Sequence, residues 1–153
     1  MRESEYRAVK RDLKKKTYSL LQWTWGLPQT LAGAALYAVH RKDVHYGFRG
    51  ACVTEWQKNE GISLGKFIFV PAGRAAAYAQ KTKEADFLLE HEYGHTLQSL
   101  ILGPAYLLLV GAPSIVWNRL PYFRNKRKKT GKSYYSPVFE SSASRLGKRN
   151  TLR

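Results

Sequence analysis

A pair of histidines four residues apart, His91 and His95, constrains the fold of this chain more than any other feature. The pair lies within residues 84–102, whose apolar periodicity predicts one amphipathic helix. Helix positions i and i+4 share a face, so both imidazoles project from one apolar stripe. Burying two imidazoles in such a stripe costs free energy unless their nitrogens have bonding partners, and one metal ion could bind both. The alternative is two half-buried histidines that are hydrogen-bonded to backbone groups.

Glu92 stands between the two histidines and completes a His-Glu-x-x-His pattern. A carboxylate at this position can act as a general base on a metal-bound water. The sequence contains no phosphate-binding glycine loop, CxxC pair, dinucleotide fingerprint or signature of a serine or cysteine nucleophile. Metal-assisted hydrolysis is therefore the chemistry that the sequence predicts. Without a metal, Glu92 would be an ordinary solvated carboxylate.

A third metal ligand has to come from elsewhere in the chain, because a catalytic zinc ion takes three protein ligands and leaves one position for water. The upstream candidates are His40, His45 and Cys52. Downstream the choice is narrower, since Glu140 is the only carboxylate side chain after Glu92.

The residues around Glu140 predict a second, short helix. Ser136 is its expected N-cap, Pro137 lies in its first turn and Gly147 is its expected stop. Glu140 would then lie in the first turn of this helix. The alternative is that Glu140 is an ordinary exposed helix carboxylate.

Residues 91–95 and 140–147 together resemble the gluzincin group of zinc metallopeptidases, in which a His-Glu-x-x-His helix supplies two histidines and a second helix supplies a glutamate. The chain is also similar to small uncharacterised bacterial proteins that carry a His-Glu-Tyr-Gly-His-Thr-Leu-Gln-Ser run before a Gly-Pro and an apolar stretch. Gluzincins often place an aspartate four residues after the ligand glutamate, where it orients a zinc histidine. Here that position is Ser144, and a hydroxyl is a weaker partner for the imidazole than a carboxylate.

The resemblance implies a zinc metallopeptidase whose Zn²⁺ is bound by His91, His95 and Glu140, with a peptide or protein as substrate. Glu92 would then be the general base that activates water and passes its proton to the leaving amine. Such a reaction also needs a hydrogen-bond donor for the oxyanion. Spacing alone does not choose among three candidates for this donor: Tyr134, Tyr135 and His45.

Residues 44–49, 51–56 and 62–70 are rich in aromatic and β-branched side chains and predict strands, with a hairpin turn at 59–61. The expected fold is α+β: a small zincin-like domain with a short antiparallel sheet beside the active-site helix, and additional apolar helices. In the peptidases that the chain resembles, an edge strand binds an extended peptide, and residues 63–70 are the candidate for that strand. The alternative is a plain core strand. Residues 71–83 are expected to form a surface connection.

A chain of 153 residues with 44% hydrophobic content suits one compact domain, here residues 1–153. The single cysteine, Cys52, excludes an intrachain disulfide and is expected to be a small buried hydrophobe.

The net charge of +15 is concentrated at the two ends of the chain. Residues 1–17 hold seven basic and three acidic side chains, residues 18–118 hold eight and seven, and residues 119–153 hold eleven and one. We expect a basic amino-terminal helix over 1–17 and a basic carboxy-terminal segment over 119–153 that carries the Glu140 helix. Such runs are usually solvated or contact a polyanionic surface, either anionic lipid or nucleic acid.

Residues 17–39 and 96–118 contain no formally charged side chain, and each stretch is long enough on paper to cross a bilayer. Glycines and prolines interrupt both, which predicts short helices joined by bends. If residues 96–118 crossed a membrane, His95 and Glu140 would lie at opposite faces and could not share an ion. We therefore expect residues 103–117 to fold back beside the active-site helix or to dip into a lipid interface. The alternative is that both stretches are core.

No signal peptide is evident, because the basic start contains acidic residues and no small-residue cleavage site follows the apolar run. We expect a cytoplasmic protein, located peripherally or integrally at the inner membrane face, whose further partner is an anionic membrane surface. The alternative function is a non-catalytic, zinc-stabilised basic protein that binds anionic membranes. Nucleic acid ranks lower as a partner, since the sequence has no recognition motif and the aromatic residues near the basic runs lie in apolar stretches.

Overall fold

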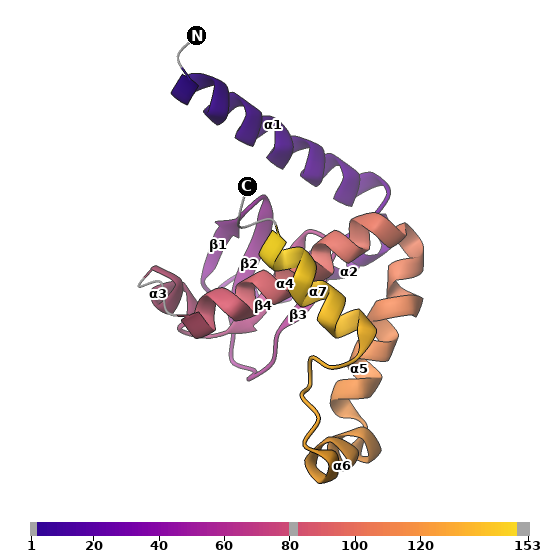
Figure 1. Cartoon of the computed structure of the whole chain (residues 1–153). Helices are drawn as coiled ribbons and strands as arrows, with labels where there is room; N and C mark the ends of the chain where they lie inside the picture. The colour runs from indigo at the N-terminus through magenta and orange to yellow at the C-terminus, as the bar shows by residue number, and fades with distance from the viewer. Residues whose placement is uncertain (1–2, 80–82, 150–153) are drawn as a thin grey trace.

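The computed structural model describes residues 3–79 and 83–149 (Figure 1). Within these residues the fold is α+β, as predicted, with a four-stranded sheet and seven α-helices. The strands are β1 (His45–Phe48), β2 (Ala51–Trp56), β3 (Ile62–Leu64) and β4 (Phe67–Pro71). The helices before the site are α1 (Glu3–Thr24), α2 (Leu27–Val39) and α3 (Arg74–Ala79). The others are α4 (Lys83–Leu102), α5 (Ala112–Arg119), α6 (Pro121–Thr130) and α7 (Val138–Arg149).

The sheet is mixed, so the prediction of an antiparallel sheet is wrong for its central pair. The strand order is β1-β2-β4-β3; β1 with β2 and β3 with β4 are antiparallel, but β2 and β4 run parallel with Val53 opposite Ile68. The hairpin turn predicted at 59–61 is therefore a connection that carries the chain from β2 to the far edge of the sheet. The turn falls instead at Gly65, whose φ of +58° favours glycine, and it divides the single strand predicted at 62–70 into β3 and β4.

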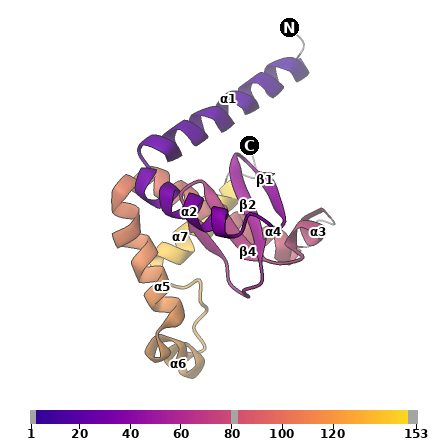
Figure 2. The ribbon, with the colours of Figure 1, turned by 180° about the vertical axis from the view of Figure 1, so that it is seen from behind.

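Helices cover both faces of the sheet, since successive side chains on a strand point to opposite sides. Ile68 and Val70 of β4 pack in a cluster with Leu89 of α4, whereas Phe67 and Phe69 pack on the other side with residues of α2. Figure 1 shows α4 and α7 in front of the sheet, and Figure 2 shows α2 on the opposite face. The active-site helix predicted from the sequence is thus a central element of the core.

Two glycines allow α7 to cross α4 at very short range. A Cβ atom built on Gly94 of α4 would lie 1.9 Å from the carbonyl oxygen of Ala143, and one built on Gly147 of α7 would lie 1.8 Å from that of Glu90. The prediction that Gly147 ends the helix is wrong, because α7 continues through it to Arg149. Gly147 is a point of helix contact.

The start of α7 also differs from the prediction. The helix begins at Val138, and the backbone N–H of Ser141 donates to the carbonyl of Pro137 at 2.8 Å. Pro137 therefore lies just before the helix, and Ser136 is one residue too early to be its N-cap. Glu140 lies in the first turn of α7, as predicted, on the same face as Ala143.

The uncharged stretch after α4 bends at Gly103 into short helical segments, as predicted, and α5 contacts α7 and not the length of α4. It forms a 3₁₀ turn, η1 (Gly103–Ala105), a π-helical turn, η2 (Leu107–Gly111), and then α5. Ser114 of α5 reaches the Glu140 carboxylate, which shows that α5 returns to the site. Nowhere in residues 3–79 and 83–149 is there a helix whose length and apolar content would suffice for a membrane crossing.

Residues 17–39, the first uncharged stretch, pack on residues 96–118 through buried amide side chains. α1 extends beyond residue 17, where the basic helix was predicted to end, and stops at Thr24. α2 begins at Leu27, after a short turn that contains Trp25. The side chain of Gln22 donates to the carbonyl of Thr96 at 2.9 Å, and that of Gln29 donates to the carbonyl of Gly103 at 3.0 Å. These bonds hold the α1–α2 corner against the end of α4. Between Pro71 and Lys83, the predicted surface connection contains the short helix α3.

Candidate metal centre

Three side chains predicted as metal ligands meet between α4 and α7. The Nε2 atoms of His91 and His95 lie 3.0 Å and 3.3 Å, respectively, from Oε2 of Glu140. One ligand atom from each residue lies within 4.8 Å of the other two. All three residues are buried, and Glu140 is 0% exposed. This group could hold a metal ion, and Glu140 is not the exposed helix carboxylate of the alternative interpretation.

The hydrogen bonds around His95 fix its tautomer. Its Nδ1 lies 2.7 Å from Oε1 of Gln98, while the amide nitrogen of Gln98 donates to the carbonyl of Phe139 and to the hydroxyl of Ser142, both at 2.7 Å. A carbonyl can only accept, so these bonds set the orientation of the Gln98 amide. Nδ1 of His95 therefore carries the proton, and its Nε2 presents a lone pair to Glu140.

His91 is held in the same tautomer by Ser144. The Ser144 hydroxyl lies 2.9 Å from Nδ1 of His91 and donates to the backbone carbonyl of Glu140 at 3.2 Å. Because its single hydrogen is used there, Ser144 accepts from the imidazole. The position where gluzincins often carry an aspartate thus contacts a histidine here as well, through a hydroxyl.

Two nitrogen lone pairs and a buried carboxylate oxygen converge, and a positive charge between them is needed to relieve their repulsion. Burial alone would raise the pKa of Glu140, but the hydrogen bonds that His91 and His95 donate when their Nε2 atoms are protonated outweigh it and hold this pKa well below its usual range. Burial would lower the pKa of His95, yet the hydrogen bond to Glu140 and the charges of Glu92 and Glu140 raise it above its ordinary value. A proton or a metal ion can supply the charge, and the two compete for the same atoms.

The second oxygen of Glu140 is already occupied. Its Oε1 accepts hydrogen bonds from the hydroxyl of Ser114 at 2.6 Å and from the phenol of Tyr134 at 3.2 Å. Only Oε2 therefore faces the imidazoles. Glu140 would bind a metal ion through one oxygen.

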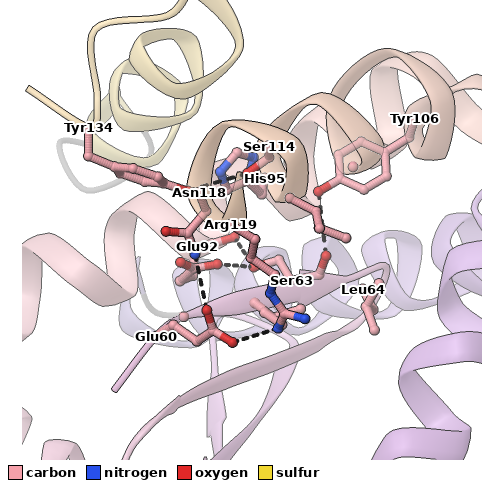
Figure 3. A pocket seen from close by; sticks show the side chains of 14 residues that line it. Glu60, Ser63, Leu64, Glu92, His95, Tyr106, Ser114, Asn118, Arg119 and Tyr134 are labelled. Carbon is pink, nitrogen blue, oxygen red and sulfur yellow. Dashed lines mark hydrogen bonds and ion pairs between the residues drawn. The ribbon is translucent and has the colours of Figure 1, made fainter. Parts of the chain in front are cut away.

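Glu92 lies beside this group in a small pocket between β3, α4 and α5 (Figure 3). Glu92 is 5% exposed, and the hydroxyl of Ser63 lies 2.7 Å from its Oε2 and 2.8 Å from its backbone carbonyl oxygen, both of which accept from it. A Cβ atom built on Gly61 would lie 2.2 Å from the other carboxylate oxygen, so glycine at this position leaves the space that Glu92 fills. The pocket has a volume of about 60 Å³ and is lined by both Glu92 and His95, with room for water next to both.

The structure brings one of the three predicted oxyanion donors into the pocket. Tyr134 lines it, and burial together with the charge of Glu140 raises its pKa, which keeps the phenol protonated. Tyr135 packs its ring against the ring of His91, with centroids 4.7 Å apart, and is not among the pocket-lining residues. His45 is on β1, the opposite edge of the sheet from β3, where its Nδ1 lies 3.0 Å from the hydroxyl of Thr54. The prediction of His45 as a donor is therefore not supported by its position.

The two remaining ligand candidates also lie outside the group. The imidazole of His40 pairs with Asp43 at 2.6 Å. Cys52 is on β2 and only partly buried, and burial raises the pKa of its thiol.

Four residues that shape the site were not predicted: Ser63, Gln98, Tyr106 and Ser114. Tyr106 is 3% exposed, lines the pocket, and donates a long hydrogen bond of 3.4 Å to the carbonyl of Ser63. Gln98 and Ser114 could have been predicted from the sequence, because each is a polar side chain within an uncharged, largely apolar stretch. Such a side chain needs a buried partner, and here each contacts a ligand residue.

Comparisons of the chain with protein-family models, curated proteins and solved structures found no match. The functional assignment therefore depends on the donor set, its hydrogen bonds and the carboxylate beside it.

Proposed function

We propose that this protein is a zinc-dependent peptidase of the gluzincin type. The observation that carries the proposal is the convergence of two imidazole nitrogens and one carboxylate oxygen beside the buried carboxylate of Glu92. In a tetrahedral site with ligand bonds of about 2.1 Å, neighbouring ligand atoms lie about 3.4 Å apart. The separations of 3.0 Å and 3.3 Å between the imidazole nitrogens and Oε2 of Glu140 are slightly shorter than this spacing, so a small outward movement would admit the ion.

The donor types favour zinc over other common divalent ions. Two histidines and one glutamate form a ligand set found in catalytic zinc sites, which keep a fourth position open for water. Calcium and magnesium prefer oxygen ligands alone. The partners of the two Nδ1 atoms, Gln98 and Ser144, support the same proposal, because zinc-binding histidines almost always donate their other N–H to a fixed acceptor.

Bound zinc would lower the pKa of its water towards about 7 and polarise the substrate carbonyl. Glu92 is the residue that takes the proton of the attacking water and hands it to the leaving amine. Ser63 holds one oxygen of Glu92 by a hydrogen bond, which orients the carboxylate. Tyr134 is the donor we assign to the oxyanion, since its phenol lines the same pocket and remains protonated. To donate to the oxyanion, its O–H would turn away from Oε1 of Glu140, its present acceptor.

An extended peptide is the substrate that the site's surroundings favour. β3 is an edge strand of the sheet, and its residues line the pocket that contains Glu92. A peptide that pairs with β3 would place its backbone beside this pocket. The pairing would displace the long hydrogen bond from Tyr106 to the Ser63 carbonyl.

The experiment compares wild type with Glu92→Gln. Each protein is loaded with zinc, its metal content is measured by mass spectrometry, and it is incubated with a fluorogenic peptide library. We expect one zinc per chain in both proteins and cleavage by wild type only. Undiminished turnover by Glu92→Gln would remove the proposed base, and the absence of bound zinc in wild type would remove the metal.

A second candidate is a zinc-stabilised protein without catalysis. It is favoured by hydrogen bonds in the pocket lining, where both carboxylate oxygens of Glu60 are bonded, one to Asn118 at 3.0 Å and the other to Arg119 at 2.7 Å. These bonds join α5 to the segment just before β3, the strand with which a peptide would pair. This function predicts one zinc per chain and no cleavage of any peptide in the library.

A further inference from the structure

An exposed apolar face runs along one side of the molecule, formed by two segments that are far apart in the sequence. We define this apolar face by exposed side chains of the turn after α1 and of α2, α4, η2 and α5: Trp25, Leu27, Ile101, Leu108, Leu109 and Ile115. Leu108 is 78% exposed and Leu109 is 59% exposed. So many large apolar side chains in one region of a protein surface indicate an interaction site.

Direct packing joins the two segments. A Cβ atom built on Gly103 would lie 2.3 Å from the indole ring of Trp25, so this ring rests on the turn after α4. Both views show the end of α1, the start of α2 and the run from the end of α4 to α5 on the same side of the molecule (Figures 1 and 2). Residues 17–39 and 96–118, which form this side, contain no Asp, Glu, Lys or Arg.

Basic helices flank the apolar face at both of its ends. The part of α1 before residue 17 is exposed and carries Arg7, Lys10, Arg11 and three consecutive lysines. At the other end, α6 carries Arg124 and the Lys126–Lys129 run, and its basic residues are mostly exposed. Figure 1 shows the carboxyl-terminal end of α1 at one end of the run from η1 to α5 and α6 at the other, with the basic part of α1 extending away from this run.

We propose that the apolar face docks on an anionic lipid bilayer, with α1 and α6 contacting the lipid phosphates on either side. Apolar side chains that enter the boundary between headgroups and acyl chains, together with nearby lysines and arginines, are the combination that binds such surfaces. Trp25 suits the headgroup layer because its indole is both apolar and a hydrogen-bond donor. A second copy of the chain fits the face less well, because a symmetric dimer would bring like-charged helices together.

The test is co-sedimentation with vesicles of phosphatidylcholine alone or mixed with phosphatidylglycerol. We expect wild type to bind the anionic vesicles and to be released by salt. Leu108→Gln with Leu109→Gln should weaken binding by about tenfold or more, and so should Lys128→Glu with Lys129→Glu. The matched control is Val44→Gln with Val138→Gln, which removes equally exposed valines outside the apolar face and should bind as wild type does.

Several outcomes would overturn the proposal. Equal binding to both vesicle types, or binding that the Leu108 and Leu109 substitutions leave unchanged, would exclude this face as an anionic-lipid contact. A lipid-free dimer that the same substitutions dissociate, seen by light scattering, would assign the face to a second copy. Salt-sensitive retention on nucleic acid without vesicle binding would assign the basic helices to that partner. Glu92→Gln should sediment like wild type, so failure of docking and failure of the peptidase proposal are separate results.

Discussion

Gly94 of α4 lies directly against the backbone of Ala143 on α7, with no space for even a methyl group between them. This contact is one residue before His95 on α4 and three residues after Glu140 on α7. The close approach of the two helices therefore determines whether the carboxylate reaches the imidazoles. A contact between helix backbones sets the dimensions of the candidate metal centre.

Gly94→Ala should separate α4 from α7 and weaken metal binding. Alanine is the better helix former by about 1 kcal/mol, so a loss of stability would report the clash itself. We expect a loss of about 2 kcal/mol in the free energy of unfolding, measured with urea, and lower zinc content. Gly47→Ala is the control, since a Cβ atom there meets nothing within 4 Å. Equal stability of the two variants would contradict the helix contact.

Zinc should stabilise the folded protein through Glu140. With free zinc at about one hundred times its Kd, binding adds about 2.7 kcal/mol to the free energy of unfolding and raises Tm by about 5 to 10 °C. A chelator should reverse the shift, and Glu140→Gln should show almost none. A full shift in that variant would mean that zinc binds elsewhere.

Gln98 should contribute to metal affinity although it is not a ligand. Gln98→Leu removes the acceptor for Nδ1 of His95, and we expect zinc affinity, measured by competition with a chromophoric chelator, to fall by about 10- to 100-fold. Ser142→Ala is the matched control, because Gln98 keeps its bond to the Phe139 carbonyl. If both variants lose affinity equally, the effect comes from local packing and not from the imidazole.

Ser144→Asp should strengthen metal binding. A carboxylate accepts the Nδ1–H of His91 more strongly than a hydroxyl does, which makes the imidazole a better ligand, and we expect zinc affinity to rise by about tenfold. Ser141→Asp places the same charge on α7, but the hydroxyl it replaces is exposed and donates to the Val138 carbonyl. A similar gain from Ser141→Asp would point to a general effect of charge.

Ser63 should affect turnover without affecting metal content. Ser63→Ala frees the Glu92 carboxylate, and we expect kcat to fall by about tenfold or more while bound zinc is unchanged. His45→Gln changes a residue at the opposite edge of the sheet and should leave kcat as in wild type. A large loss of kcat in His45→Gln would restore this histidine as a candidate donor.

The donors of the site were predictable because each depends on local spacing or scarcity. His91 and His95 share a face of any α-helix, and Glu140 had no competing carboxylate after Glu92. His45 was a weaker candidate, since its place depends on which edge of the sheet β1 occupies. Strand order is a non-local property, and it lies outside what spacing alone can predict.

Two errors in the predicted fold have the same physical origin. Both Gly61 and Gly65 suit a turn, and the choice between them depends on β2 pairing with β4 and not with β3. Gly147 matches the usual helix stop, yet its function is to contact the backbone of Glu90. In both cases a glycine was assigned to local geometry, whereas a distant segment determined its role.

Ser114 and Ile115 are neighbours on α5 that both line the pocket beside Glu92, but their other contacts differ. Ser114 holds the Glu140 carboxylate, while Ile115 is 51% exposed and belongs to the apolar face. If contact with a bilayer shifts α5, the ligand carboxylate must respond, and the affinities for lipid and for metal become thermodynamically coupled. Such coupling is reciprocal, so loading the centre with metal would change the partition of the protein onto vesicles by the same factor.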